Sequence, residues 1–278
     1  MKTTLQAFAA AMMMLITFVS CGKKDLSANA VDTAPETKPA IQTAVSTTIN
    51  ANCAGFYKAL PFRYDSSAKK YSLILFIHGI GELGNGTSDL PNMLRAGLPR
   101  LINKKGFPPE FTVNGESHSF VVIAPQFKKW PSNAEVNDVL RYALDHFRID
   151  TNRIYVTGLS MGGGVTWEFS AQYGASIAAI VPICGGSWPD NTRAQNIASF
   201  NLPVWAFHND DDGAVPVSYS RDYVSKINSW NPATPATITT WPTGGHDAWT
   251  KAYDPSTKKN NRNMYEWMLG FQRRVTAK

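Results

Sequence analysis

The residues best suited to chemistry are a serine, a histidine and a run of aspartates, each in a segment rich in small or polar residues. Ser160 is the centre of the G-x-S-x-G string GLSMG (158–162), which follows the apolar segment 153–157. A sharp turn from a strand into a helix exposes such a serine hydroxyl and requires neighbours without bulk. The pattern predicts a nucleophile, and a serine that merely caps a helix is the alternative.

A serine hydroxyl stays protonated at neutral pH and needs a base to become a nucleophile. His246 is the preferred base, because it lies in the polar segment PTGGHD (242–247) after a predicted strand at 236–241. His208 is the second candidate, since it ends the apolar segment 203–207. Both histidines are expected at the carboxyl ends of strands, where the serine also lies.

The imidazole needs a carboxylate that fixes its tautomer and stabilises its charged form. The segment NDDDGAVP (209–216) holds three adjacent aspartates after a predicted strand. Asp212 is the preferred acid, Asp210 is the second choice, and solvated loop charges account for the others. The chain order Ser160, Asp212, His246 is the order expected on the α/β-hydrolase sheet.

Stabilising an oxyanion requires two backbone N–H groups directed at the developing negative charge. We expect one from Met161, directly after the serine, and one from Ile80 in the loop HGIGE (78–82). An ordinary strand-to-helix turn at 78–82 is the alternative.

The elements that must position these residues alternate between strands and helices. Nearly continuous apolar runs predict strands buried on both faces of a parallel sheet, at 71–77, 120–124, 153–157, 177–183 and 203–207. Helical patterns lie at 135–147, 165–173, 217–227 and 262–271. Alternation of this kind predicts an α/β fold with a mostly parallel, doubly wound sheet and helices on both faces.

The composition excludes several classes of protein. With 44 % hydrophobic and 17 % charged residues among 278, the chain is not disordered, collagenous or a coiled coil. The net charge of +6 comes from scattered basic pairs rather than a stripe, so no nucleic-acid partner is expected. No convincing cluster of metal ligands is present, and three cysteines are too few for a disulfide scaffold.

The N-terminal segment 1–20 reads as a signal peptide, because its apolar run is too short to span a membrane. The string FVSCG (18–22) resembles a bacterial lipoprotein cleavage box, which implies lipidation of Cys21. We therefore expect an exported lipoprotein, with an outer-membrane location favoured by Gly22 and ordinary secretion as the alternative. The lipid anchor is the only membrane contact expected.

Residues 22–52 lack aromatic side chains, so the sequence predicts a flexible tether at 21–52 and one folded domain at 53–278. Within that domain Cys53 and Cys184 either pair or remain two buried free thiols. The sequence does not indicate an oligomeric state.

Several segments together resemble α/β-hydrolase esterases of the feruloyl/acetylxylan esterase type, similar to carbohydrate esterase family 1 and to "predicted peptidase" relatives of dienelactone hydrolase. These segments are LILFIHGIGELG (73–84), IDTNRIYVTGLSMGGG (149–164), IVPICGG (180–186), FHNDDDGAVPV (207–217) and GGHDAWTKAY (244–253). The resemblance covers about residues 55–274, and it places the family's triad on Ser160, Asp212 and His246. In one departure, Asn209 follows His208 where the family often has glycine.

The resemblance implies ester hydrolysis through an acyl-enzyme, with no metal or cofactor. Only 18 residues separate Cys184 from Pro203, where a lid often lies, so we expect no large lid and an open cleft. Glu82, Trp188 and Trp249 are the candidate substrate contacts. The expected substrate is an ester-bearing polysaccharide fragment that carries acetyl or feruloyl groups, or a simpler aryl ester.

Two other functions are the alternatives to an esterase. A serine peptidase similar to prolyl oligopeptidase would need the same triad. A lipoprotein that binds glycans without catalysis would need none of it.

Overall fold

In the computed structural model, residues 34–273 are described, and they belong to one compact unit. The signal peptide predicted at 1–20, the lipidation of Cys21 and the first part of the predicted tether lie outside the described residues. Among residues 34–273, no helix has both the length and the apolar character that crossing a membrane requires.

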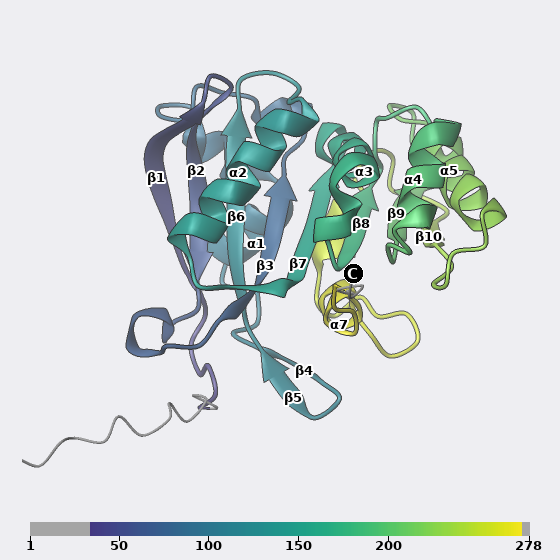
Figure 1. Cartoon of the computed structure of the whole chain (residues 1–278). Helices are drawn as coiled ribbons and strands as arrows, with labels where there is room; N and C mark the ends of the chain where they lie inside the picture. The colour runs from purple at the N-terminus through teal and green to yellow at the C-terminus, as the bar shows by residue number, and fades with distance from the viewer. Residues whose placement is uncertain (1–33, 274–278) are drawn as a thin grey trace, which may run out of the picture. The chain divides into compact units, whose positions relative to one another are not determined.

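An eight-stranded sheet forms the centre of this unit (Figure 1). Its strands, in spatial order, are β1 (Ile41–Asn50), β2 (Cys53–Leu60), β6 (Phe120–Phe127), β3 (Tyr71–Ile77), β7 (Ile149–Leu159), β8 (Ala179–Ile183), β9 (Trp205–Asn209) and β10 (Thr237–Trp241). In this spatial order, β6, β3, β7, β8, β9 and β10 run parallel to one another. Strand β1 pairs antiparallel with β2, and β2 pairs antiparallel with β6. The predicted α/β-hydrolase fold with a mostly parallel sheet is confirmed.

Helices cover both faces of the sheet, as the doubly wound pattern requires. One face packs against α2 (Asn133–His146), α3 (Met161–Tyr173), α4 (Asn191–Ser199) and α5 (Val217–Ser229). The other packs against α1 (Gly97–Asn103), α6 (Trp249–Tyr253) and α7 (Met264–Leu269). The small hairpin of β4 (Phe111–Val113) and β5 (Glu116–His118) leads into the amino end of β6, at the bottom of Figure 1.

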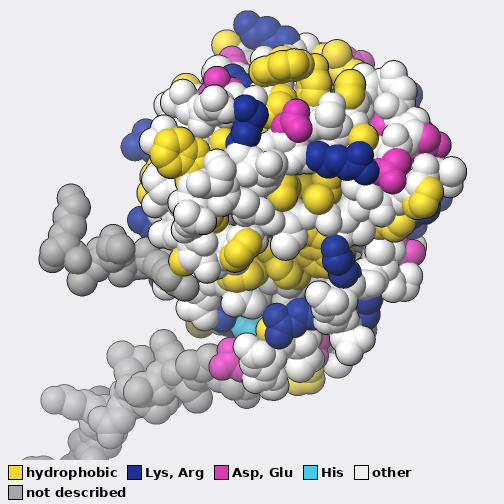
Figure 2. Space-filling view, turned by 90° about the vertical axis from the view of Figure 1, so that its right-hand side faces the viewer, with side chains coloured by type: hydrophobic (Ala, Val, Ile, Leu, Met, Phe, Trp, Pro, Cys, Tyr) yellow, Lys and Arg dark blue, Asp and Glu magenta, His cyan; other side chains and the backbone are white. Residues whose placement is uncertain are grey.

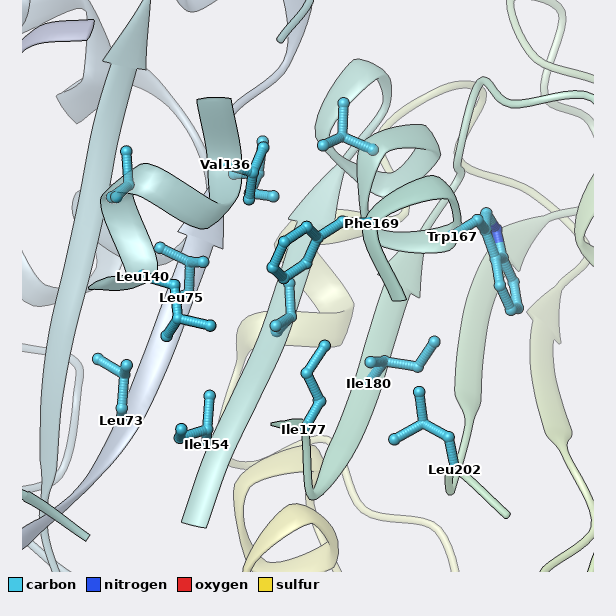
Figure 3. Packing of buried hydrophobic residues seen from close by; sticks show 14 of the residues in the cluster. Leu73, Leu75, Val136, Leu140, Ile154, Trp167, Phe169, Ile177, Ile180 and Leu202 are labelled. Carbon is cyan, nitrogen blue, oxygen red and sulfur yellow. The ribbon is translucent and has the colours of Figure 1, made fainter. Parts of the chain in front are cut away.

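Strand β3 shows why the predicted strands are apolar without interruption. Successive side chains of a strand point to opposite faces, and both faces of this sheet are covered. Leu73 and Leu75 pack under α2 with Leu140, whereas Ile74 and Phe76 belong to the cluster on the other face (Figure 3). All seven residues of β3 are buried.

The predicted tether is wrong over residues 41–50, because these residues form strand β1. The folded domain therefore begins before Cys53. Residues Ile41–Asn50 form an antiparallel hairpin with β2 and make the edge of the sheet. Val45 and Ile49 pack against the hydrophobic core. The composition alone suggested too little apolar area, but an edge strand needs only one partly buried face. Its threonine, valine and isoleucine residues are good strand formers.

Two other expectations concern the cysteines and the lid. Cys53 and Cys184 are both free and buried, so they do not pair. The connection from β8 to β9 carries α4 and no large lid.

Figure 2 shows the face on the side of α4, α5 and β10, where lysine and arginine side chains lie dispersed among hydrophobic and uncharged ones.

Candidate active site

Ser160 lies on a strained turn between β7 and α3. Its backbone has φ +54° and ψ −116°, a conformation that non-glycine residues rarely adopt. The turn fits because Gly158 and Gly162, two residues before and after the serine, have no side chains. A Cβ on Gly158 would lie 2.4 Å from the Gly162 carbonyl oxygen, and one on Gly162 would lie 2.0 Å from the Ile77 carbonyl oxygen. The spacing G-x-S-x-G is therefore a packing requirement of this turn.

Replacing Gly162 with alanine is expected to destabilise the protein by about 1–3 kcal/mol, because overpacked sites must shift to accept the new methyl group. Here the obstacle is the backbone of β3, which cannot rotate away. Urea denaturation would measure the effect. Gly213→Ala is the matched control, since a Cβ there meets nothing within 4 Å. Equal stability of the two variants would contradict the packing argument.

The structure brings the predicted nucleophile, base and acid into one hydrogen-bonded chain. His246 Nε2 lies 2.8 Å from Ser160 Oγ, and His246 Nδ1 lies 2.7 Å from Asp212 Oδ2. The three residues follow the carboxyl ends of β7, β9 and β10. The Asp212 side chain is fully buried, whereas the His246 side chain is 26 % exposed. A substrate can therefore reach the serine–histidine pair while the carboxylate stays shielded from water.

The three adjacent aspartates have different partners. Asp210 Oδ1 accepts from Arg221 at 2.8 Å on the surface. Asp211 Oδ1 accepts the Gly245 N–H at 2.8 Å. Only Asp212, among the three, reaches His246. The geometry thus selects Asp212 over Asp210 as the carboxylate of the chain.

The Asp212 carboxylate is held in its ionised form. Burial raises its pKa, but hydrogen bonds from His246 and from the Val215 and Ala214 N–H groups outweigh that effect and keep the pKa below its ordinary value. Oδ1 accepts both backbone N–H groups at 2.9 Å. A fixed negative charge therefore faces the imidazole.

The loop HGIGE lies beside the serine, since a Cβ on Gly79 would lie 3.6 Å from Ser160 Cβ. Ile80 begins a 3-10 turn at Ile80–Glu82, and Met161 begins α3. Within residues 34–273, neither the Ile80 nor the Met161 N–H donates a backbone hydrogen bond in a loop or turn. Both are thus available to an oxyanion. The side chain of Ile80 itself is exposed.

Glu82, predicted to contact substrate, uses its carboxylate inside this loop. Its Oε2 accepts the Gly79 N–H at 2.9 Å. Burial raises the Glu82 pKa, which this hydrogen bond and Arg95 partly offset. These contacts fit a residue that holds the loop in position.

Comparison with known proteins identifies a family for this chain. Residues 64–257 match the family model described as phospholipase/carboxylesterase. The chain belongs to this family. Feruloyl esterase D of Neurospora crassa is 26 % identical over 204 residues, which are 69 % of this chain and 64 % of that protein.

Two further similarities extend the comparison. The bifunctional acetylxylan esterase/xylanase XynS20E of Neocallimastix patriciarum is 27 % identical over 106 residues, 35 % of this chain and 15 % of that protein. The chain thus spans less than two thirds of either curated relative. The crystal structure of a thermostable esterase has 26 % identity and a TM-score of 0.61, and the match covers 84 % of this chain and 63 % of that one. The expected resemblance to α/β-hydrolase esterases is confirmed.

In this carboxylesterase-family chain, hydrogen bonds join the loop after β9, which carries Asp212, to the loop after β10, which carries His246. Asn209 Nδ2 donates to the Gly245 carbonyl oxygen at 2.9 Å, and Asp211 accepts the Gly245 N–H. Sequence reasoning noted Asn209 only as a departure from the family pattern. The side chain that replaces glycine here holds the loop that carries His246.

Three tryptophans lie near the hydrolase site or border its loops. Trp249 meets the His246 ring edge-on at 5.3 Å and 90°. Trp188, 67 % exposed, meets the Tyr219 ring edge-on at 5.2 Å. Trp130 was not predicted, although it follows β6 in the same way that other site residues follow their strands. A Cβ on Gly186 would lie 3.7 Å from its ring and 3.8 Å from the Ser160 carbonyl oxygen.

Cys184 lies against the acid and base of the site. Its sulfur and the ligand atoms of Asp212 and His246 lie within 4.8 Å of one another. Burial raises the pKa of the Cys184 thiol far above its ordinary value, so the thiol stays protonated. Because Asp212 and His246 already share a hydrogen bond, the cluster fits the serine-hydrolase site better than a metal site.

Proposed function

We propose that this protein is a serine carboxylic-ester hydrolase that removes acetyl or feruloyl-type groups from polysaccharide fragments through an acyl-enzyme. The observation that carries the proposal is the continuous chain from Ser160 through His246 to buried Asp212, at 2.8 and 2.7 Å. This arrangement activates a hydroxyl by general base catalysis.

The reaction follows from the positions of these groups. Ser160 Oγ attacks the ester carbonyl while His246 Nε2 takes its proton, and the carbonyl oxygen gains the negative charge. The Ile80 and Met161 N–H groups stabilise that oxyanion. His246 then gives its proton to the leaving alcohol, which leaves the acyl group on Ser160. A water molecule, deprotonated by His246, attacks this ester, and the acid departs as the proton returns to Ser160.

The polysaccharide part of the proposal rests on aromatic surface and on relatives. The curated relatives are named as a feruloyl esterase and as an acetylxylan esterase/xylanase. Trp130 and Trp188 are exposed, yet each ring has a neighbour that orients it. Trp130 Nε1 donates to Glu168 at 3.2 Å, and the Trp188 ring meets the Tyr219 ring edge-on at 5.2 Å. Exposed rings in fixed positions suit stacking on a sugar or an aryl group.

The test uses the full chain as the enzyme and compares several substrates. We expect hydrolysis of p-nitrophenyl acetate and methyl ferulate, and release of acetate or ferulate from xylan. Cleavage of a dipeptide amide without cleavage of either ester would support a peptidase instead. Binding of xylan oligosaccharides with no turnover and no labelling by a fluorophosphonate would support a non-catalytic glycan-binding protein.

Trp130→Ala is expected to raise KM for feruloylated xylan oligosaccharides about 3- to 10-fold, because a stacked aromatic contact contributes about 0.5–1.5 kcal/mol. The kcat for p-nitrophenyl acetate should change less than twofold. Steady-state kinetics on both substrates would measure this. Trp230→Ala is the control, since Trp230 is 51 % exposed but follows the far end of α5. An equal rise in KM in both variants would refute a role of Trp130 in binding.

We further propose that the enzyme is exported and carries a lipid on Cys21, as an outer-membrane lipoprotein. The string FVSCG and the short apolar run before it support this proposal. An esterase held at the cell envelope would meet polysaccharide fragments before their uptake.

A further inference from the structure

The carboxylate of Asp212 has a second imidazole partner. Its Oδ2 atom, which accepts from His246 Nδ1, also lies 3.1 Å from His208 Nε2. The His208 and Asp212 side chains are fully buried. With two backbone N–H groups on Oδ1, both carboxylate oxygens have two donors each. Water is therefore not needed to solvate this charge.

The contacts of His208 determine which of its nitrogens carries the proton. Its Nε2 atom lies 3.0 Å from the Val215 carbonyl oxygen, and this oxygen can only accept a hydrogen bond. Nε2 therefore carries hydrogen and donates to Val215 and Asp212 together. Nδ1, 2.8 Å from Ser220 Oγ, then accepts the hydroxyl hydrogen when the ring is neutral. Burial lowers the His208 pKa, although Val215 and Asp212 partly offset this, so the neutral ring persists at neutral pH.

We propose that His208 is a positioning residue of the hydrolase, whose Nε2–H holds Asp212 Oδ2 in line with His246 Nδ1. The inference rests on the proposed function, because it assigns a role in the same reaction. Ser220, in the first turns of α5, fixes the His208 tautomer. The chain of contacts thus runs from Ser160 through His246, Asp212 and His208 to a helix behind the site.

This contact has two effects on the reaction. A carboxylate held by four donors cannot rotate, so the imidazole of His246 keeps the orientation in which Nε2 faces Ser160. Hydrogen bonds to the ionised carboxylate also make it a weaker base. The proton that His246 takes from Ser160 then stays on the imidazole and is available to the leaving alcohol. His208 itself does not act as the base, because both its nitrogens are bound within the buried network.

The experiment compares His208→Leu with His208→Gln in the full chain. Leucine removes the donor, whereas the glutamine Nε2 can replace the imidazole Nε2 as a donor to Asp212. For His208→Leu we expect kcat on p-nitrophenyl acetate to fall about 10- to 100-fold, the range for losing a hydrogen bond to a charged group. KM should stay within twofold. His208→Gln should recover most of the lost kcat.

Ile227→Ala is the control for destabilisation, because it empties a buried site on α5 without touching Asp212. It should keep the wild-type kcat at temperatures where it is folded. The proposal is overturned if folded His208→Leu keeps the wild-type kcat, or if His208→Gln is as impaired as His208→Leu. It is also overturned if Ile227→Ala loses kcat to the same extent.

The rate constant for labelling Ser160 by a fluorophosphonate provides a second readout that is independent of the natural substrate. It should follow the same order, with wild type and His208→Gln faster than His208→Leu. If no ester is hydrolysed but labelling keeps this order, the proposed substrate is wrong and the positioning role stands. If esters are hydrolysed and labelling is equal in all variants, the positioning role is wrong and the proposed function stands.

Discussion

Ser160→Ala is expected to lower kcat for ester hydrolysis about 10⁴- to 10⁶-fold, the loss seen when a serine hydrolase loses its nucleophile. Without Oγ no acyl-enzyme can form, and His246 has no hydroxyl to deprotonate. The fold should persist, because alanine keeps the Cβ that the turn at φ +54° already accommodates. Steady-state kinetics with p-nitrophenyl acetate, together with thermal unfolding, would measure both effects.

The control for Ser160→Ala is Ser170→Ala. Ser170 is buried on the same helix, α3, and its hydroxyl has no hydrogen-bond partner among the described residues. This variant should keep the wild-type kcat and react with a fluorophosphonate, whereas Ser160→Ala should not react. If Ser160→Ala kept more than about one hundredth of the wild-type kcat, a different nucleophile would have to be sought.

Asp212→Asn is expected to lower kcat about 10⁴-fold, since an amide in place of the carboxylate favours the wrong imidazole tautomer. The amide nitrogen would donate where Oδ2 now accepts from both His246 and His208. His246 Nδ1 would then have to accept, which places the hydrogen on Nε2, where it can no longer receive the Ser160 proton. The pH profile of kcat would show a partial recovery at high pH, where hydroxide assists.

Asp210→Asn tests the choice between neighbouring carboxylates. Asp210 pairs with Arg221 on the surface, and such ion pairs contribute about 0–1 kcal/mol. We therefore expect less than a twofold change in kcat and a small loss of stability. If Asp210→Asn lost as much activity as Asp212→Asn, the two carboxylates would not have the separate roles that the geometry gives them.

Local sequence determined the scaffold and its most distinctive turn. Strand β3 and its parallel neighbours are recognisable because burial on both faces demands continuous apolar residues. Ser160 is recognisable because a turn so tight requires glycine at 158 and 162. The order of nucleophile, acid and base follows from the order of the strands. These features depend on near neighbours in the chain, so they can be read from it.

Tertiary structure alone decided the other features, because they depend on partners far apart in the chain. The sequence prefers Asp212 among three adjacent aspartates but leaves Asp210 as a second choice, and the contact of Asp212 with His246, 34 residues away, decides between them. The segment Ile41–Asn50 resembles a tether until β2 pairs with it. His208 is a second candidate base by sequence, whereas its buried contacts with Asp212 and Ser220 place it behind the site. Hydrogen-bond direction and long-range pairing are not encoded in local composition or spacing.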